Sequence, residues 1–156
     1  MTASQRRRLI AGQDRSRGQA LVEFSLTIVV FLVLLMAIVD LGRGIYMYNG
    51  VAEAAREIAR VTSVHPGTTL GNSAETQAVI DTQMALIPAL QDPTFECVDI
   101  ENAAITGVCR AGDRVKVTIT APYSPVTPVM SLSGTWTMSS TSSVQLSVEN
   151  ILAPAP

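Results

Sequence analysis

Few residues in this sequence are of types that do chemistry, and their spacing does not bring them together. His65 is the only histidine, and it stands directly before Pro66 and Gly67, which favour a turn. A Ser-His-Asp triad would therefore have to be built on a connector between two elements. The sequence also has no glycine-rich phosphate-binding loop. We therefore predict that the protein is not an enzyme and that it has no catalytic residues and no cofactor.

Three acidic residues in the second half of the chain are the candidates for a metal site. Asp99 and Glu101 alternate on a predicted strand, which favours solvated side chains, and Asp113 follows Gly112 in a predicted turn, where aspartate bonds locally. Carboxylate oxygens are the ligands that calcium takes. We expect no metal site here, and calcium binding by these three residues is the alternative.

Cys97 and Cys109 are the only cysteines. Two cysteines alone do not make a zinc site, which takes four ligands or three with an open position. In an oxidising compartment they would most simply pair with each other. We therefore predict a Cys97–Cys109 disulfide if this part of the chain is exported.

The most informative chemical residue is a carboxylate inside an apolar run, "RGQALVEFSLTIVVFLVLLMAIVD". No charge occurs from Phe24 to Val39, and Ser25 and Thr27 are the only polar side chains there. With its flanks the run is long enough for a bilayer, which takes about 20 residues. We predict a transmembrane helix over residues 19–41, and Glu23 near its start then needs an explanation.

Charge is distributed unevenly around this run. Five arginines precede it, and Asp14 is the only acid among them, whereas the chain from Gln19 onward has six basic and twelve acidic residues. An acidic body argues against nucleic-acid binding. A basic cluster before a membrane segment sets its orientation, so the N-terminus is expected in the cytoplasm. The residues of this topology signal are Arg6, Arg7, Arg8, Arg15 and Arg17.

Three interpretations of the apolar run compete. A cleavable secretory or twin-arginine signal is one, but "MAIVDLGRG" offers no convincing small-x-small cleavage site. A plain signal anchor is the second, with Glu23 favoured by the helix dipole in the first turn. The third interpretation rests on the residues around Glu23.

Gly18, four further residues, and then Glu23-Phe24 follow a short basic leader. This arrangement resembles the processing site of type IV prepilins of the tight adherence (Flp) class. The resemblance extends to the N-terminal segment of TadE-like proteins, the pseudopilins of that system, over about a third of the chain. The matching residues are Gly18, Glu23-Phe24, Asp40-Leu41-Gly42-Arg43, Tyr46, Asn49, Ala54-Ala55-Arg56-Glu57 and Ala59-Arg60. Leu41 departs from the family, which often has an aromatic residue there.

The resemblance implies that a prepilin peptidase cuts between Gly18 and Gln19. The new amine of Gln19 could then pair with Glu23 of its own or an adjacent helix, which would lower the cost of both charges and fix axial register. The implied function is that of a minor pilin in pilus assembly, supporting surface adhesion and biofilm formation. The implied partners are the peptidase, a second pseudopilin, the major Flp pilin, the inner-membrane assembly platform and membrane lipid.

The expected location is the bacterial inner membrane, as a single-pass protein with an exported C-terminal domain that becomes pilus-associated if it enters the fibre. The alternative function is an exported binding domain on an unprocessed signal anchor. A more remote alternative is a secreted enzyme behind a cleaved signal, which the absence of a catalytic constellation disfavours.

Apolar and small residues recur at helical spacing beyond the membrane segment, at Val51, Ala55, Ile58, Ala59 and Thr62. We predict one continuous helix from about Gln19 to about Val64, with acidic residues one turn before Arg60. Gly42 and Gly44 mark either a tolerated kink or close packing against a neighbouring helix. The residues expected at the membrane interface are Asp40, Arg43 and Tyr46, with Tyr48 suited to the same place.

The remainder, residues 65–156, is predicted to be a small α+β domain. "GNSAETQAVIDTQMALIPAL" predicts a short helix capped by Asn72, with Glu75 three residues later. Alternation in "DRVKVTITAPY" and near the end of "TWTMSSTSSVQLSVEN" predicts antiparallel strands, as do "TFECVDIE" and "AITGVCR". Four segments result: a basic leader (1–18), the membrane helix (19–41), its exported continuation (42–64) and the α+β domain. The "APAP" tail is expected to be disordered.

Overall fold

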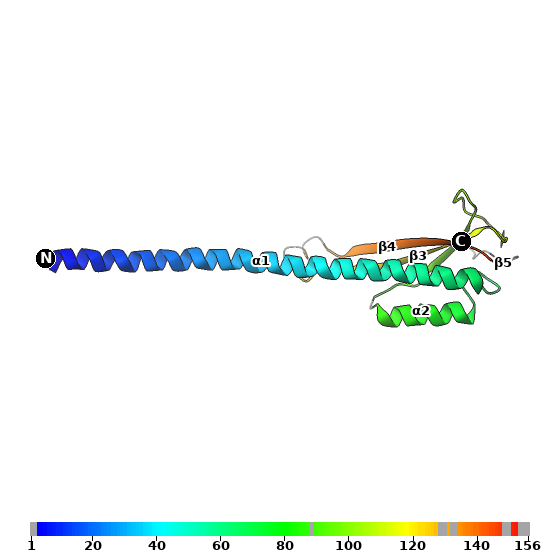
Figure 1. The fold of residues 1–156 in the computed structure, drawn as a ribbon, viewed down its shortest axis with the longest axis horizontal. Coiled ribbons are helices and arrows are strands. Elements are labelled where there is room, and N and C mark those ends of the chain that lie inside the picture. Colours follow the sequence, from blue (N-terminus) through cyan, green and yellow to red (C-terminus); the bar gives the residue numbers. More distant parts are fainter. Residues whose placement is uncertain (1–2, 88, 128–130, 132–133, 148–150, 153–156) are drawn as a thin grey trace. The chain divides into compact units, whose positions relative to one another are not determined.

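The computed structural model describes residues 3–87, 89–127, 131, 134–147 and 151–152, with backbone alone for 3–17 and 151–152. The chain divides into two compact units, residues 1–41 and 42–156. The first consists of one helix, and the second contains all the strands described. Figure 1 labels the helices and strands of the chain.

Helix α1 (Ala3–Val64) runs through both units. Its predicted end at Val64 is confirmed, but it begins well before Gln19, because the leader is rich in helix-forming arginine, glutamine and alanine and has no proline. Helical backbone continues through Gly42 and Gly44. A Cβ at Gly44 would lie 3.7 Å from the Tyr123 ring, an ordinary contact with a strand of the domain, and packing of these glycines against a neighbouring helix stays a prediction.

One face of the 42–64 part of α1 is fully buried, as its period predicted. Ala54, which the sequence prediction omitted, belongs to it. Thr62 is also buried, and its hydroxyl donates to the Ile58 carbonyl at 2.7 Å, which removes the cost of an unpaired polar group. The fully buried residues of this face are Val51, Ala54, Ala55, Ile58, Ala59 and Thr62.

Helix α2 (Ala74–Leu86) is capped by Ser73 and not by Asn72, so that prediction was wrong. The Ser73 hydroxyl accepts from the Thr76 N–H at 3.1 Å and donates to the His65 carbonyl. Asn72 instead accepts from the Thr69 N–H at 3.2 Å within the preceding turn. Ser73 is the better cap here because its hydroxyl can also donate to the His65 carbonyl at the end of α1, where the last carbonyls of the helix need a donor.

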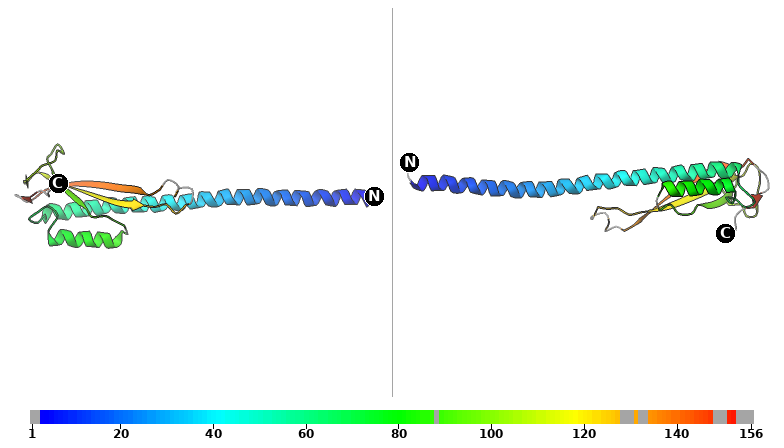
Figure 2. Two further views of the ribbon diagram at one scale, coloured as in Figure 1. Left: turned by 180° about the vertical axis from the view of Figure 1, so that it is seen from behind. Right: turned by 90° about the horizontal axis from the view of Figure 1, so that it is seen from below.

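The apolar side chains of α2 face the core of the domain. Val79, Ile80 and Met84 pack into the same core as the buried face of α1. α2 runs beside the C-terminal part of α1 (Figure 2), and a Cβ at Gly50 would lie 3.3 Å from Ile87. The absent side chain at Gly50 thus lets the two helices approach. Pro88, which follows α2 and is a residue type that limits helices, lies outside the described residues.

Three strands form an antiparallel sheet in the order β1-β3-β4. They are β1 (Thr94–Val98), β3 (Arg114–Tyr123) and β4 (Trp136–Gln145). A separate pair joins β2 (Val108–Cys109) to β5 (Ile151–Leu152). The fold class is α+β, as predicted.

The alternation predicted for β3 is confirmed residue by residue. Val115, Val117 and Ile119 are buried against the helices, while Lys116 and Thr118 lie on the other face. Lys116 forms an ion pair with Glu96 of β1 at 2.7 Å. β4 covers the Ser/Thr-rich stretch and ends at Gln145, so it begins earlier in "TWTMSSTSSVQLSVEN" than the alternation near the end of that segment predicted. Val148 and the "APAP" tail lie outside the described residues.

Candidate functional site

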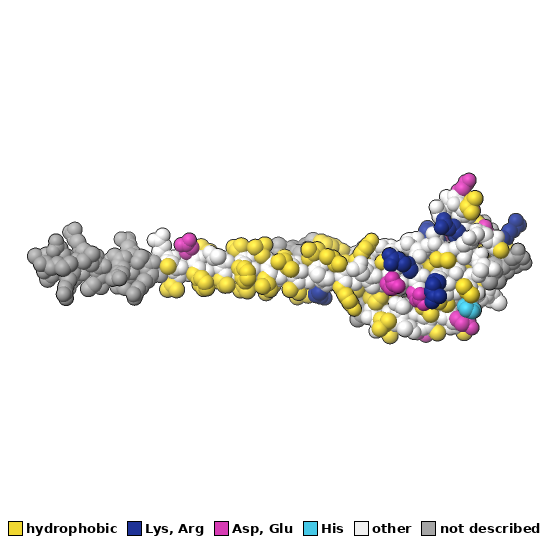
Figure 3. Space-filling model, in the orientation of Figure 1, with side chains coloured by type: hydrophobic (Ala, Val, Ile, Leu, Met, Phe, Trp, Pro, Cys, Tyr) yellow, Lys and Arg dark blue, Asp and Glu magenta, His cyan; other side chains and the backbone are white. Residues whose placement is uncertain are grey.

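The apolar part of α1 exposes its side chains in all directions. Apart from Ile28, which is half-buried, the leucine, valine, isoleucine, phenylalanine and methionine side chains between residues 21 and 39 are 40–70% exposed (Figure 3). Within the described residues, α1 is the one helix long and apolar enough to cross a membrane, judged by length and composition. Its candidate stretch, Gly18–Val64, has a window of mean hydropathy 2.8, and none of that window is buried.

The polar hydroxyls of this stretch are satisfied within the helix. Ser25 donates to the Val22 carbonyl and Thr27 to the Glu23 carbonyl, each at 2.8 Å. Such back-bonding allows serine and threonine to lie in a lipid environment without an unpaired donor. The carboxylate of Glu23 is therefore the chemically distinctive group of this segment.

Gly18 has no packing reason to be glycine. A Cβ at this position would meet nothing within 4 Å, and its φ lies outside the left-handed region. Glycine inside a helix costs up to about 1 kcal/mol relative to alanine. Gln19, Glu23 and Phe24 are likewise exposed on α1. The four residues of the predicted processing site thus have no packing role in the unit that contains them.

The three predicted interface residues have different surroundings. Asp40 is 3% exposed, whereas Tyr46 is 80% exposed. The Arg43 guanidinium lies 5.9 Å from the centroid of the Tyr123 ring, a cation–π geometry that holds the start of the 42–64 segment on β3. Burial of Asp40 had no signal in the sequence. The predicted place of these residues at a membrane surface stays a prediction, and the side chains of the five topology arginines lie outside the described structure.

Exposed acid–base pairs line the solvent side of α1 in the second unit. Arg60 bonds Glu57 at 2.6 and 3.0 Å, as the spacing predicted, and Glu53 pairs with Arg56 at 3.2 Å. The hydrogen bond from Arg60, aided by its charge, lowers the pKa of Glu57 against a smaller opposing effect of burial. Each such pair supports the helix by a few tenths of a kcal/mol.

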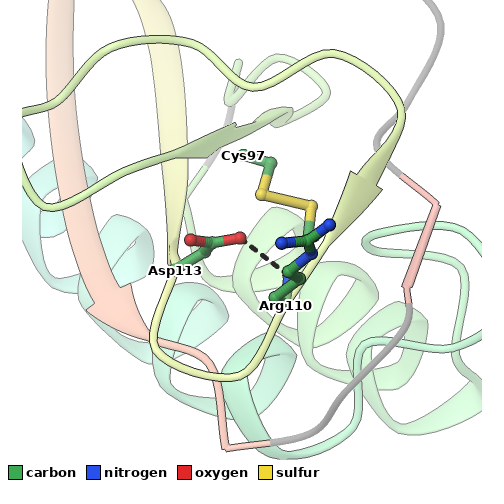
Figure 4. The surroundings of a disulfide bond; sticks show 4 residues. Cys97, Arg110 and Asp113 are labelled. Atoms are coloured by element: carbon green, nitrogen blue, oxygen red, sulfur yellow. Dashed lines mark hydrogen bonds between the residues drawn. A yellow bond between two sulfur atoms is a disulfide. The ribbon is translucent and has the colours of Figure 1, made fainter.

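Cys97 and Cys109 form a disulfide between β1 and β2, as the sequence predicted for an oxidising compartment, with their Cα atoms 6.1 Å apart (Figure 4). Beside it, the Arg110 N–H donates to Asp113 at 2.7 Å. Asp99 accepts from two backbone N–H groups, those of Glu101 and Ala103, at 2.8 Å.

The alternative of calcium binding by Asp99, Glu101 and Asp113 finds no support. Two of these carboxylates hold turns through backbone hydrogen bonds. No group of three potential metal-ligating side chains occurs in the described part of the chain. Asp99 and Asp113 therefore have a local structural explanation.

The chain thus has the features of a membrane-anchored protein. Its first unit is an apolar helix with exposed side chains, and its second unit is a small α+β domain with a disulfide. Residues 18–60 match the family model described as TadE-like protein, so this N-terminal segment is similar to that of TadE-like proteins. The match begins at Gly18 and covers the apolar run, the predicted interface residues and the buried face of α1 as far as Ala59. No curated protein and no solved structure matches the chain.

Proposed function

We propose that this protein is a TadE-like pseudopilin, or minor pilin, of a tight adherence pilus system. It inserts into the inner membrane with its arginines in the cytoplasm and its α+β domain exported. A prepilin peptidase then cuts between Gly18 and Gln19. The role is structural and involves no catalysis, and its consequence for the cell is pilus-dependent adhesion and biofilm formation.

The observation that carries this proposal is the family match starting at Gly18, joined to the environment of that glycine. A helix interior without a packing constraint would favour alanine over glycine. A peptidase that must reach the backbone on the carbonyl side of the cut supplies a reason for the missing side chain.

Cleavage would leave a cationic amine at Gln19, one helical turn before the Glu23 carboxylate. Each charge alone is costly at membrane depth, and pairing them within one chain or between neighbours reduces that cost. The surrounding apolar side chains are exposed and can pack against lipid first and against other helices later. The pair would thus set the axial position of one subunit against the next.

The partners implied are the prepilin peptidase, a second pseudopilin, the major Flp pilin and the inner-membrane platform. The platform and the major pilin would meet the apolar part of α1, because assembly requires that surface to leave lipid for a helix bundle. The α+β domain would remain outside the membrane.

Replacing Gly18 by phenylalanine tests the processing site in the native host. Gly12 provides a matched control, since it is also followed by glutamine but has no glutamate five residues later. We expect the Gly18→Phe chain to retain its leader, visible as a heavier band, while the Gly12→Phe chain is processed normally. Equal processing of both variants would remove the assignment.

Replacing Glu23 by alanine tests the register. The variant should insert into the membrane and yet fail to support pili, with Glu75→Ala, an exposed acid of α2, as the control that assembles normally. Normal piliation with Glu23→Ala would contradict the role given to the carboxylate. If the unmodified protein is neither cleaved nor assembled into pili, the alternative function applies, that of an exported binding domain on a signal anchor.

A further inference from the structure

The outer edge of strand β4 is a feature of the domain that the proposed pilus role does not use. β4 pairs with β3 over ten residues, from Arg114↔Gln145 to Tyr123↔Trp136. It is the last strand of the sheet order β1-β3-β4, and no described strand pairs with its other side. An edge strand presents a row of backbone donors and acceptors to its surroundings.

The residues that form this row follow from the register. The Thr120 carbonyl accepts from the Gln91 N–H at 2.9 Å on the β1 side of β3, so even-numbered residues of β3 direct their backbone groups to β1. Odd-numbered residues of β3 then bond to even-numbered residues of β4. The Leu146 N–H donating to the Asp113 carbonyl at 2.8 Å obeys the same alternation. The outward-directed residues of β4 are Thr137, Ser139, Thr141, Ser143 and Gln145.

This edge lacks the features that normally protect an edge strand. Residues 136–145 include no charged residue and no proline, and none has a positive φ that would mark a bulge. The opposite edge is shorter, charged and partly bonded. β1 is five residues long, carries the Glu96–Lys116 ion pair, and its Cys97 carbonyl already accepts from the Ile105 N–H at 2.8 Å.

The core face of β4 is also incompletely covered. Val117 and Ile119 of β3 are fully buried, but their partners Ser142 and Ser140 are only half-buried. At the start of the strand, Trp136 is 44% exposed. Tryptophan is among the residue types most enriched at interaction hot spots, and Trp136 is exposed beside the open edge.

We propose that the outer edge of β4 binds an extended segment of a different protein, which adds to the sheet as a fourth strand. Backbone groups are the ligand here, and such β-strand addition takes its affinity from main-chain hydrogen bonds. The uncharged edge selects an uncharged segment. Its residues beside Trp136 would be apolar, and those beside the hydroxyl row of the outer face would be serine, threonine or other β-branched residues.

A second copy of this chain does not fit the edge in an antiparallel pair. β4 runs in the same direction as α1, since Met138 lies 3.9 Å from a Cβ placed on Gly44 and the Ser147 N–H donates to the Ser63 carbonyl at 3.2 Å. Antiparallel pairing of two β4 strands would turn the two 42–64 segments in opposite directions. The residues before Gly42 would then leave opposite ends of the dimer and could not enter one bilayer from the same side.

Two other self-associations also fail. A parallel β4–β4 pair about a two-fold axis along the strands would point identical residues to opposite faces of the sheet and break its pleat. A head-to-tail array would place β4 against β1 of the next copy. That edge is short, charged and bonded at Cys97. The occupant is therefore an unlike chain.

Site-specific photo-crosslinking in the native host tests the proposal on the full-length protein. p-Benzoylphenylalanine is placed at Ser139 on the edge, and at Thr120 as the control. Thr120 is the residue directly opposite Ser139 on β3, on the same face but one strand inward. We expect a discrete adduct from position 139 and none from position 120. Mass spectrometry should map the adduct to a period-two segment of another protein.

The backbone is tested by two further changes at Thr141. Thr141→Pro removes one outward N–H and should lower the adduct yield about five-fold, the factor for one backbone hydrogen bond. Thr141→Ala keeps that N–H and should leave the yield unchanged. Retention of the Cys97–Cys109 disulfide on a non-reducing gel shows that each variant is folded, and Thr141→Lys replaces the proline variant if that one misfolds.

The proposal is overturned by no adduct at position 139, by equal adducts at both positions, by an adduct to a second copy of this chain or to lipid, or by a yield that neither Thr141→Pro nor Thr141→Lys reduces. None of these outcomes bears on processing at Gly18, which is read separately from the mass of the mature chain.

Discussion

Replacing Cys97 and Cys109 together by alanine is expected to weaken the α+β domain by about 3 kcal/mol. The two cysteines are 12 residues apart in sequence, and the entropy that a cross-link removes from the unfolded chain gives this value for a loop of that size. Both side chains are buried, so alanine is chosen over serine to avoid burying an unpaired hydroxyl.

The assay is urea unfolding of the full-length protein in detergent micelles, followed by the fluorescence of Trp136, the only tryptophan. With a slope of about 1.5 kcal/mol per molar urea, a loss of 3 kcal/mol lowers the midpoint by about 2 M. Reduction of the unmodified protein should give the same shift, and reductant should leave the double variant unchanged. Equal midpoints for the oxidised protein and the double variant would refute the argument that this loop closure stabilises the domain.

The same pair of thiols reports on the compartment of the domain. Disulfides persist in oxidising compartments and are rare in the cytosol. Alkylation of intact cells before lysis should therefore find both thiols protected in the native host. Free, alkylated thiols on Cys97 and Cys109 would contradict an exported domain.

Three further predictions concern stability in the same assay. Gly71→Ala should destabilise the domain more than Gly107→Ala, although both glycines have φ near +100°. A Cβ at Gly71 would lie 2.7 Å from the Phe95 ring of β1, whereas one at Gly107 would meet nothing within 4 Å. The difference between the two variants, about 1–3 kcal/mol, therefore measures the overpacking. Ile58→Ala should cost about 2–5 kcal/mol because this fully buried side chain fills the α1 face of the core, and a loss below 1 kcal/mol would contradict that placement. The folded-state pKa of Glu57 lies below the ordinary 4.5, so Glu57 contributes stability above pH 4.5 that is lost as the pH falls through the lowered pKa. The small advantage expected over Glu57→Gln at pH 7 should therefore shrink steadily as the pH is lowered below 4.5, and an advantage that does not change with pH would refute the pairing with Arg60.

The sequence predicted those parts of the fold that periodicity controls. The buried face of α1 recurs at three- and four-residue steps, and β3 alternates without exception, so both could be predicted from local pattern alone. Pairing of Cys97 with Cys109 was predictable because no other cysteine competes. The processing site at Gly18 stays a prediction, and it rests on spacing along one chain alone.

Other features depend on contacts between distant segments and had no local signal. Asn72 and Ser73 are both good helix caps, and the His65 carbonyl at the end of α1 selected the serine. The pairing of β2 with β5, and the position of β4 at the edge of the sheet, are set by non-local register. Burial of Asp40 likewise could not be inferred from a charged residue at the end of an apolar run.

The most direct test of the central claim is the N-terminus of the mature protein, extracted from membranes of the native host and determined by mass spectrometry. The account predicts a chain that begins at Gln19, with Glu23 as its fifth residue. A chain that begins at Met1 would contradict peptidase processing, and the protein would then be a signal-anchored exported domain.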